Sequence, residues 1–152
     1  MAKNTGKPTE RLFEASIDAL GKRGYYYRIK DAAAIRGLTG KTGMADATPS
    51  DYICVVKGKM FFGEVKSTQH ERLFEFSLLK KGQNSHGLRI IAAGGQYLVI
   101  VHRILTDEWY IIPRSVIKDH EATTKERSIP WLDLRKFECS TEPTPAGNRP
   151  LW

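Results

Sequence analysis

The sequence predicts an α/β protein in which a mixed central β-sheet is flanked by helices. The first observation is the order of the expected elements, which runs helix, strand, hairpin, helix, strand pair, helix. The second is an apolar hairpin whose strands carry apolar side chains on both faces, as is typical of covered strands. The third is size, because 152 residues with 41% hydrophobic content suffice for one domain with its own core. We expect this domain at residues 1–139 and a disordered tail at 140–152.

The first helix is predicted to begin at Thr9, a suitable N-cap residue. A short strand is expected over residues 25–29. The segment from about 31 to 50 is glycine-bearing and basic, and we expect a flexible loop there. The apolar stripe that predicts the helix, and the glycines near which it ends, are Leu12, Phe13, Ile17 and Leu20, then Gly21 and Gly24.

The hairpin is predicted in the stretch PSDYICVVKGKMFFGEVKST, residues 49–68. If its turn is Lys57-Gly58, with Gly58 supplying a positive φ, Asp51 lies opposite Glu64. If the turn is one residue later, Asp51 lies opposite Lys66 instead. Side chains alternate along a strand, so either register places these three charges on one face at the open end of the hairpin.

The second half of the chain is predicted to contain a helix from residue 73 to about 93, ended by Gly94-Gly95. Two strands follow at 97–103 and 109–112, and Pro113 is expected to open a short helix through Lys118. The remaining tail, STEPTPAGNRPLW, is rich in proline and polar residues, which predicts disorder.

The composition narrows the class of protein. No apolar run is long enough for a membrane span, and the first residues, MAKNTGKPTE, lack a signal-peptide core, so we expect no membrane partner and a cytoplasmic location. Two cysteines make no disulfide framework. The 24 basic and 17 acidic residues give a net charge of +7, which suggests a polyanionic partner. The residues predicted to contact phosphates are Arg28, Lys30, Arg36 and Lys41.

Two other motifs do not predict a site. The stretch GLTGKTG resembles part of a phosphate-binding loop, but that motif needs a glycine five residues before Gly40, where Ile35 stands. We therefore expect no nucleotide cofactor. The histidines are scattered without the spacing of zinc ligands, so surface or core roles are expected for them.

The charges at the open end of the hairpin predict metal-dependent chemistry. Two neighbouring carboxylates, Asp51 and Glu64, repel each other unless a cation lies between them. Carboxylates, waters and one backbone carbonyl, for which Val65 is the candidate, are the ligands that Mg²⁺ accepts. Lys66 cannot bind the metal, but it can hold an attacking water and stabilise charge on a phosphate. These parts are the requirements of phosphodiester hydrolysis.

The arrangement Asp51…Glu64-Val65-Lys66 resembles the signature of the PD-(D/E)xK (restriction-endonuclease-like) nucleases, and SDYICVVKGKMFFGEVKST resembles the RecU family of Holliday junction resolvases. The likeness continues through FEFSLLKKGQNSHGL and QYLVIVHRILTDEWYIIPRSVI, and covers residues 10 to about 118. It implies a homodimeric endonuclease of DNA recombination and repair that cuts four-way junctions with Mg²⁺, for which Mn²⁺ substitutes. Carried over by position, the implied site residues are Glu14, Asp51 and Glu64 at the metal, Lys66 as the catalytic lysine and Gln83 on an active-site helix.

This sequence departs from the pattern of the RecU family at two places, and it allows alternatives for one site residue and for the function. The usual Pro-Asp is Pro-Ser-Asp here, and the family's projecting stalk is reduced to residues 31–50, which puts junction selectivity in question. The small size suits a phage-encoded relative. The helical pattern slightly favours Glu10 over Glu14 as the acid of the first helix, whereas the resemblance favours Glu14. Other possible functions are a nuclease of the same core that acts on flaps, single strands or restriction-type sites, and a DNA-binding module without turnover.

Overall fold

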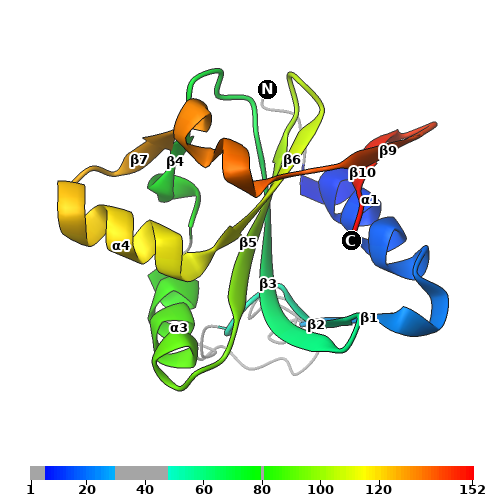
Figure 1. The fold of residues 1–152 in the computed structure, drawn as a ribbon, viewed down its shortest axis with the longest axis horizontal. Helices are drawn as coiled ribbons and strands as arrows, with labels where there is room; N and C mark the ends of the chain where they lie inside the picture. Colours follow the sequence, from blue (N-terminus) through cyan, green and yellow to red (C-terminus); the bar gives the residue numbers. More distant parts are fainter. Residues whose placement is uncertain (1–5, 30–47, 80) are drawn as a thin grey trace, which may run out of the picture.

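The computed structural model describes residues 6–29, 48–79 and 81–152. In this part of the chain the main sheet has six strands in the order β1-β2-β3-β5-β6-β8, and only β3 and β5 run parallel (Figure 1). The predicted mixed sheet is therefore confirmed. The strands are β1 (Gly24–Arg28), β2 (Tyr52–Val56), β3 (Lys59–Thr68), β5 (Tyr97–Arg103), β6 (Glu108–Pro113) and β8 (Glu138–Cys139).

Helices cover the sheet from both sides (Figure 1). The helix α1 (Gly6–Asp18) packs on one face, and α3 (Lys81–Ala92) and α4 (Arg114–Thr124) pack on the other. Strand alternation divides the core accordingly, because successive side chains point to opposite faces. The α1 side contains Phe13, Ile17, Tyr52, Cys54, Val65 and Ile100, and the other side contains Tyr97, Val99, Val101, Tyr110, Ile112 and Ile117.

The hairpin has the first of the two predicted registers. Val56 pairs with Lys59, so the turn is Lys57-Gly58, and both turn residues have positive φ, 50° and 83°. Such two-residue turns match the twist of antiparallel strands. The pairing of Tyr52 with Gly63 places Asp51 opposite Glu64. The alternative register, with Asp51 opposite Lys66, is wrong.

The first helix begins earlier than predicted. It starts at Gly6, so Thr9 is not its N-cap residue. Thr9 is buried inside the helix, and its hydroxyl is hydrogen-bonded to Nδ1 of His102 at 3.0 Å. The partner lies 93 residues away in the sequence, and this long-range contact outweighs the local preference of threonine for a cap.

The helix predicted from residue 73 is wrong in its first part. Leu73–Glu75 form strand β4, paired with β7 (Ser128–Pro130), and Phe76–Leu78 form a 3₁₀ turn. Phe74 and Phe76 are both buried, with exposed Glu75 between them, which is the spacing of a strand and not of a helix. The helix proper is α3, and it ends as predicted, with Gly94 at φ 90°.

The strand pair β5–β6 is confirmed, and α4 continues beyond the predicted end to Thr124. None of the helices in the described ranges is long and apolar enough to cross a membrane. The predicted flexible loop at 31–50 lies mostly outside the described residues, as do Lys30, Arg36, Lys41 and the GLTGKTG stretch.

The tail from Ser140 is ordered, so the prediction of disorder is wrong. It forms a hairpin of β9 (Thr141–Thr144) and β10 (Gly147–Pro150), which lies along α1 (Figure 1). The Trp152 ring then stacks on Phe61 at 5.6 Å, and its Nε1 donates to Ser16 Oγ at 2.8 Å. The tail is polar in composition apart from a few apolar residues, and the packing of one of them, Trp152, against the core holds the tail in place.

We expect Trp152→Ala to destabilise the protein by about 2–3 kcal/mol, because the substitution removes a large, partly buried side chain that packs against the core on the α1 side. Chemical denaturation measures this loss. The neighbouring Leu151 is 47% exposed, so Leu151→Ala is a matched control that should change stability by less than about 0.5 kcal/mol. Equal unfolding midpoints for the two variants would mean that the tail does not stabilise the core.

Candidate active site

Glu64 and Lys66 lie two residues apart in β3 and share the face of the sheet that α3 and α4 partly cover. Glu64 is 0% exposed. Its Oε2 accepts a hydrogen bond from the Tyr97 hydroxyl at 3.2 Å, whereas its Oε1 accepts none and has only the ion pair with Lys66 Nζ at 3.3 Å. Oε1 of this buried carboxylate is therefore available to coordinate a cation.

Asp51 is held against β3 just before β2 begins. Its backbone N–H donates to the Gly63 carbonyl at 3.1 Å, and its Oδ2 accepts from the Val65 N–H at 2.9 Å. The N–H and C=O of one strand residue point to the same side, so the Val65 carbonyl is also directed toward the side of Asp51. The hairpin thus brings Asp51, Glu64 and the Val65 carbonyl to one place.

The electrostatics of Glu64 are unfavourable for a bare carboxylate. Burial raises the pKa of Glu64, and the negative charge of Asp51 raises it further, against the lowering effect of Lys66. Two carboxylates in this arrangement are stabilised by a cation between them.

The donor set fits a hard divalent cation. Two carboxylates and a carbonyl offer only oxygen ligands, and the orphaned Oε1 of Glu64 is the atom that gains most from coordination. Within the described ranges, no cluster of three or more His, Cys, Asp or Glu side chains is placed to hold a metal. Water and substrate oxygens usually supply several of the ligands of Mg²⁺.

The structure does not bring Glu14 to Asp51 and Glu64. Its Oε1 accepts a hydrogen bond from the Tyr52 hydroxyl at 2.6 Å, and the Tyr52 side chain lies on the α1 face of the sheet. Glu10, the alternative acid, forms an ion pair with Arg28, which also lies 3.9 Å from Glu14. Arg28 holds both helical acids next to β1, and the role of either acid at the metal stays a prediction.

Gln83 lies in the first turn of α3, and its role also stays a prediction.

The same region supplies a residue that the sequence analysis missed. Arg114, 3% exposed at the start of α4, donates to Asn84 Oδ1 at 2.8 Å, and its positive charge acts on both Glu64 and Tyr97. Burial lowers the pKa of Arg114. Nothing in the spacing marks Arg114 or Tyr97 as neighbours of Glu64, because both come from strands or helices distant in sequence.

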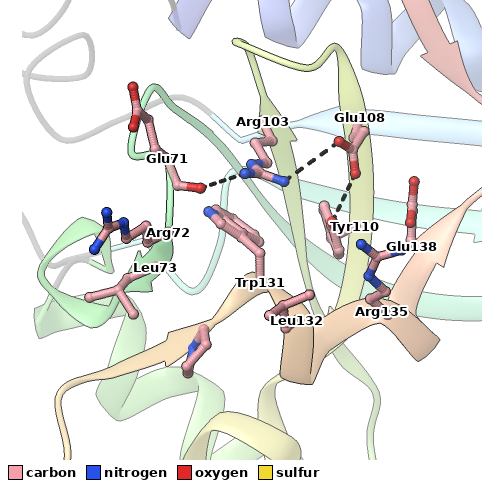
Figure 2. Close-up of a pocket in the computed structure, with 11 residues that line it drawn as sticks. Glu71, Arg72, Leu73, Arg103, Glu108, Tyr110, Trp131, Leu132, Arg135 and Glu138 are labelled. Atoms are coloured by element: carbon pink, nitrogen blue, oxygen red, sulfur yellow. Dashed lines mark hydrogen bonds and ion pairs between the residues drawn. The ribbon is translucent and has the colours of Figure 1, made fainter.

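A separate cavity of about 740 Å³ lies near the end of β5 (Figure 2). Arg103 lies 5.4 Å over the Trp131 ring, forms an ion pair with Glu108 at 3.5 Å and donates to the Glu71 carbonyl. Tyr110 in turn donates to Glu108 at 2.9 Å. These contacts tie the segment after β3 and the 3₁₀ segment Trp131–Phe137 to the sheet. Of the sequence-predicted site residues that the structure describes, none lines this cavity.

Comparisons with known proteins identify the family and the fold of this chain. The family model of RecU, described as recombination protein U, matches residues 26–144. Among solved structures, Hjc of the archaeal hyperthermophile Archaeoglobus fulgidus, a Holliday junction resolvase, superposes with a TM-score of 0.55 at 14% sequence identity. The superposition covers 86% of this chain and 93% of that chain, which makes the fold similar over nearly the whole length. A search of curated proteins found no match.

Proposed function

Since this chain belongs to the RecU family of Holliday junction resolvases, we propose that it is a Mg²⁺-dependent endonuclease that cuts branched DNA in recombination with Asp51, Glu64 and Lys66. The observation that carries the proposal is the buried carboxylate of Glu64, with an orphaned oxygen, opposite Asp51 and 3.3 Å from Lys66. A buried charge without full hydrogen bonding is unfavourable for stability alone, so a functional role explains its presence.

Each residue has a separate task in the proposed reaction. Asp51 and Glu64 bind the divalent cation, with the Val65 carbonyl as a third ligand. The bound cation supplies Lewis-acid stabilisation of the negative charge that develops on the phosphate. Lys66 orients the attacking water and adds positive charge beside the scissile phosphate. Tyr97 donates its hydroxyl to Glu64 and so holds that carboxylate in one orientation.

Glu14 and Gln83 have proposed roles that the cluster of Asp51, Glu64 and Lys66 does not depend on. Glu14 has its hydrogen bond to Tyr52, the residue directly after Asp51, so it supports the start of β2 from the opposite face of the sheet. Gln83 lies in the first turn of α3. The resemblance to the RecU family is what assigns both residues to the site, and substitution of either residue tests its role separately from that of Asp51.

The proposed substrate is a four-way junction, and the proposed assembly is a homodimer. A junction has two strands to cut, related by approximate two-fold symmetry, which a C₂ dimer matches with two copies of one site.

The test is incubation with four-way junction, flap, duplex and single-stranded DNA, with Mg²⁺, with Mn²⁺ and with EDTA, after light scattering has given the mass. Cleavage of flaps or single strands at the rate of junctions, by a monomer, would favour the alternative nuclease. Binding without cleavage of any substrate would favour a DNA-binding module.

We expect the predicted phosphate-contacting residues Arg28, Lys30, Arg36 and Lys41 to act without regard to base sequence. The double variant Arg36→Ala/Lys41→Ala should bind every DNA more weakly, and the slope of log affinity against log salt should fall by about two. Fluorescence anisotropy at several salt concentrations measures the slope. The matched control is Lys118→Ala/Lys125→Ala, which removes two exposed lysines at α4 and its end. An equal slope for the two double variants would exclude the contact.

A further inference from the structure

The face of the sheet that carries Asp51 and Glu64 continues into an exposed surface on β1. Tyr25 and Tyr27 are 59% and 55% exposed. Tyr26, between them, points to the α1 side and contacts the Tyr52 ring at 6.0 Å. Strand β1 therefore presents two tyrosine rings on one face and uses the third for packing.

This surface is continuous with the candidate active site. Tyr27 pairs with Ile53, which is two residues from Asp51, and Ile53 pairs with Phe62, which is two residues from Glu64. The strands β1 and β2 extend away from α3 and α4, which lie over the other half of this face (Figure 1). We name this surface the tyrosine face, and it consists of Tyr25, Tyr27, Ile53, Val55, Met60 and Phe62.

The tyrosine face offers flat rings for stacking. Exposed aromatic rings are a usual means of binding nucleotides that are not in a duplex, because every base has a flat face for stacking. Two exposed basic residues, Lys22 and Arg23, directly precede β1. The other basic residues of segments 22–28 and 52–63 lie on the α1 side, because Arg28 pairs with Tyr52, Lys59 pairs with Val56, and Lys57 Nζ donates to the Trp152 carbonyl.

We propose that Tyr25 and Tyr27 stack on bases that lose a stacking neighbour at a branch point next to the scissile phosphate, so that the enzyme selects branched DNA. The proposal rests on the proposed function, since it places DNA in the site of Asp51 and Glu64. A strand with its phosphate at these carboxylates passes the tyrosine face within one or two nucleotides, because diagonal neighbours in a sheet are about 7–8 Å apart. Continuous duplex offers no free base face and gains nothing from the tyrosines.

The experiment uses the full chain with Asp51→Asn, which is not expected to cleave, and EDTA, so that only binding is measured. Adding Tyr25→Ala/Tyr27→Ala should weaken binding to a four-way junction about tenfold or more, and binding to duplex much less. The slope of affinity against salt should not change, since stacking releases no counterions. Tyr25→Phe/Tyr27→Phe should restore binding. The control Leu132→Ala changes another exposed apolar residue, 73% exposed, and should bind as its parent does.

A second readout locates the contact. A junction with 5-iododeoxyuridine at the branch point should form a photo-crosslink in the peptide that contains Tyr25 and Tyr27. Unchanged junction affinity together with a crosslink elsewhere would overturn the proposal. If Tyr25→Ala/Tyr27→Ala lowered the slope of affinity against salt, the tyrosine face would bind phosphates. If the same change converted a dimer to a monomer, the tyrosine face would contact a second copy of the chain. Either outcome would also overturn the proposal. Because these measurements need no cleavage, a failure of the nuclease proposal appears separately, as an inactive wild-type protein with Mg²⁺.

Discussion

Asp51→Asn and Glu64→Gln should each reduce the rate of junction cleavage by at least about 10³-fold. Each substitution removes one of the two carboxylates proposed to bind a cation, and such a cation would contribute several kcal/mol of transition-state stabilisation. Binding of junction DNA should stay equal or become tighter, since a negative charge next to phosphate is removed. Single-turnover cleavage and anisotropy measure the two effects. The control Asp133→Asn changes an exposed acid elsewhere and should cleave normally.

The stability of the Glu64→Gln variant separates a chemical effect from unfolding. Burial raises the pKa of Glu64 above its ordinary value of 4.5, so the charged form destabilises the metal-free protein at pH 7. The wild-type carboxyl contributes stability below pH 4.5 and loses it as the pH rises through the raised pKa. Glu64→Gln should therefore be at least as stable as wild type at pH 7 without metal, and this advantage should vanish at acidic pH. Wild-type cleavage by either variant would remove Asp51 and Glu64 from the site.

Lys66→Ala should reduce cleavage by about 10²–10³-fold without weakening the binding of Mg²⁺. The lysine is not a ligand, and its removal takes a positive charge away from Glu64 Oε1, which lies 3.3 Å from Lys66 Nζ. Titration calorimetry gives the affinity for Mg²⁺, and single-turnover kinetics give the rate.

The matched control for this prediction is Lys59→Ala. Lys59 is exposed at the other end of β3, next to the turn, and its removal should leave both the rate and the affinity for Mg²⁺ unchanged. Loss of Mg²⁺ affinity in Lys66→Ala would mean that the lysine organises the site and does not act on the substrate. Full activity would exclude Lys66 from the reaction.

The hairpin and its charges were predictable from the sequence because they depend on local rules. Two apolar runs around Lys57-Gly58 predict a hairpin with either of two registers, and both bring Asp51, Glu64 and Lys66 together at its open end. The structure has the register in which Asp51 lies opposite Glu64. The alternation of side chains then puts Lys66 on the same face. The mixed sheet followed from the order of the strands, in which β3 and β5 are separated by a helix and so run parallel.

The tertiary structure decided what surrounds these residues. Several interactions join segments far apart in the chain: the hydrogen bond of Glu64 with Tyr97, the electrostatic interaction of Glu64 with Arg114, the hydrogen bond of Glu14 with Tyr52 and the anchoring of Trp152. Local pattern carries no information on such contacts, since many distant partners suit the same side chain equally well. Phe74 illustrates the same limit, because its strand β4 pairs with β7, a segment distant in the chain. The charged cluster is thus determined locally, whereas the burial that adjusts the pKa of Glu64 arises only when distant segments pack around it.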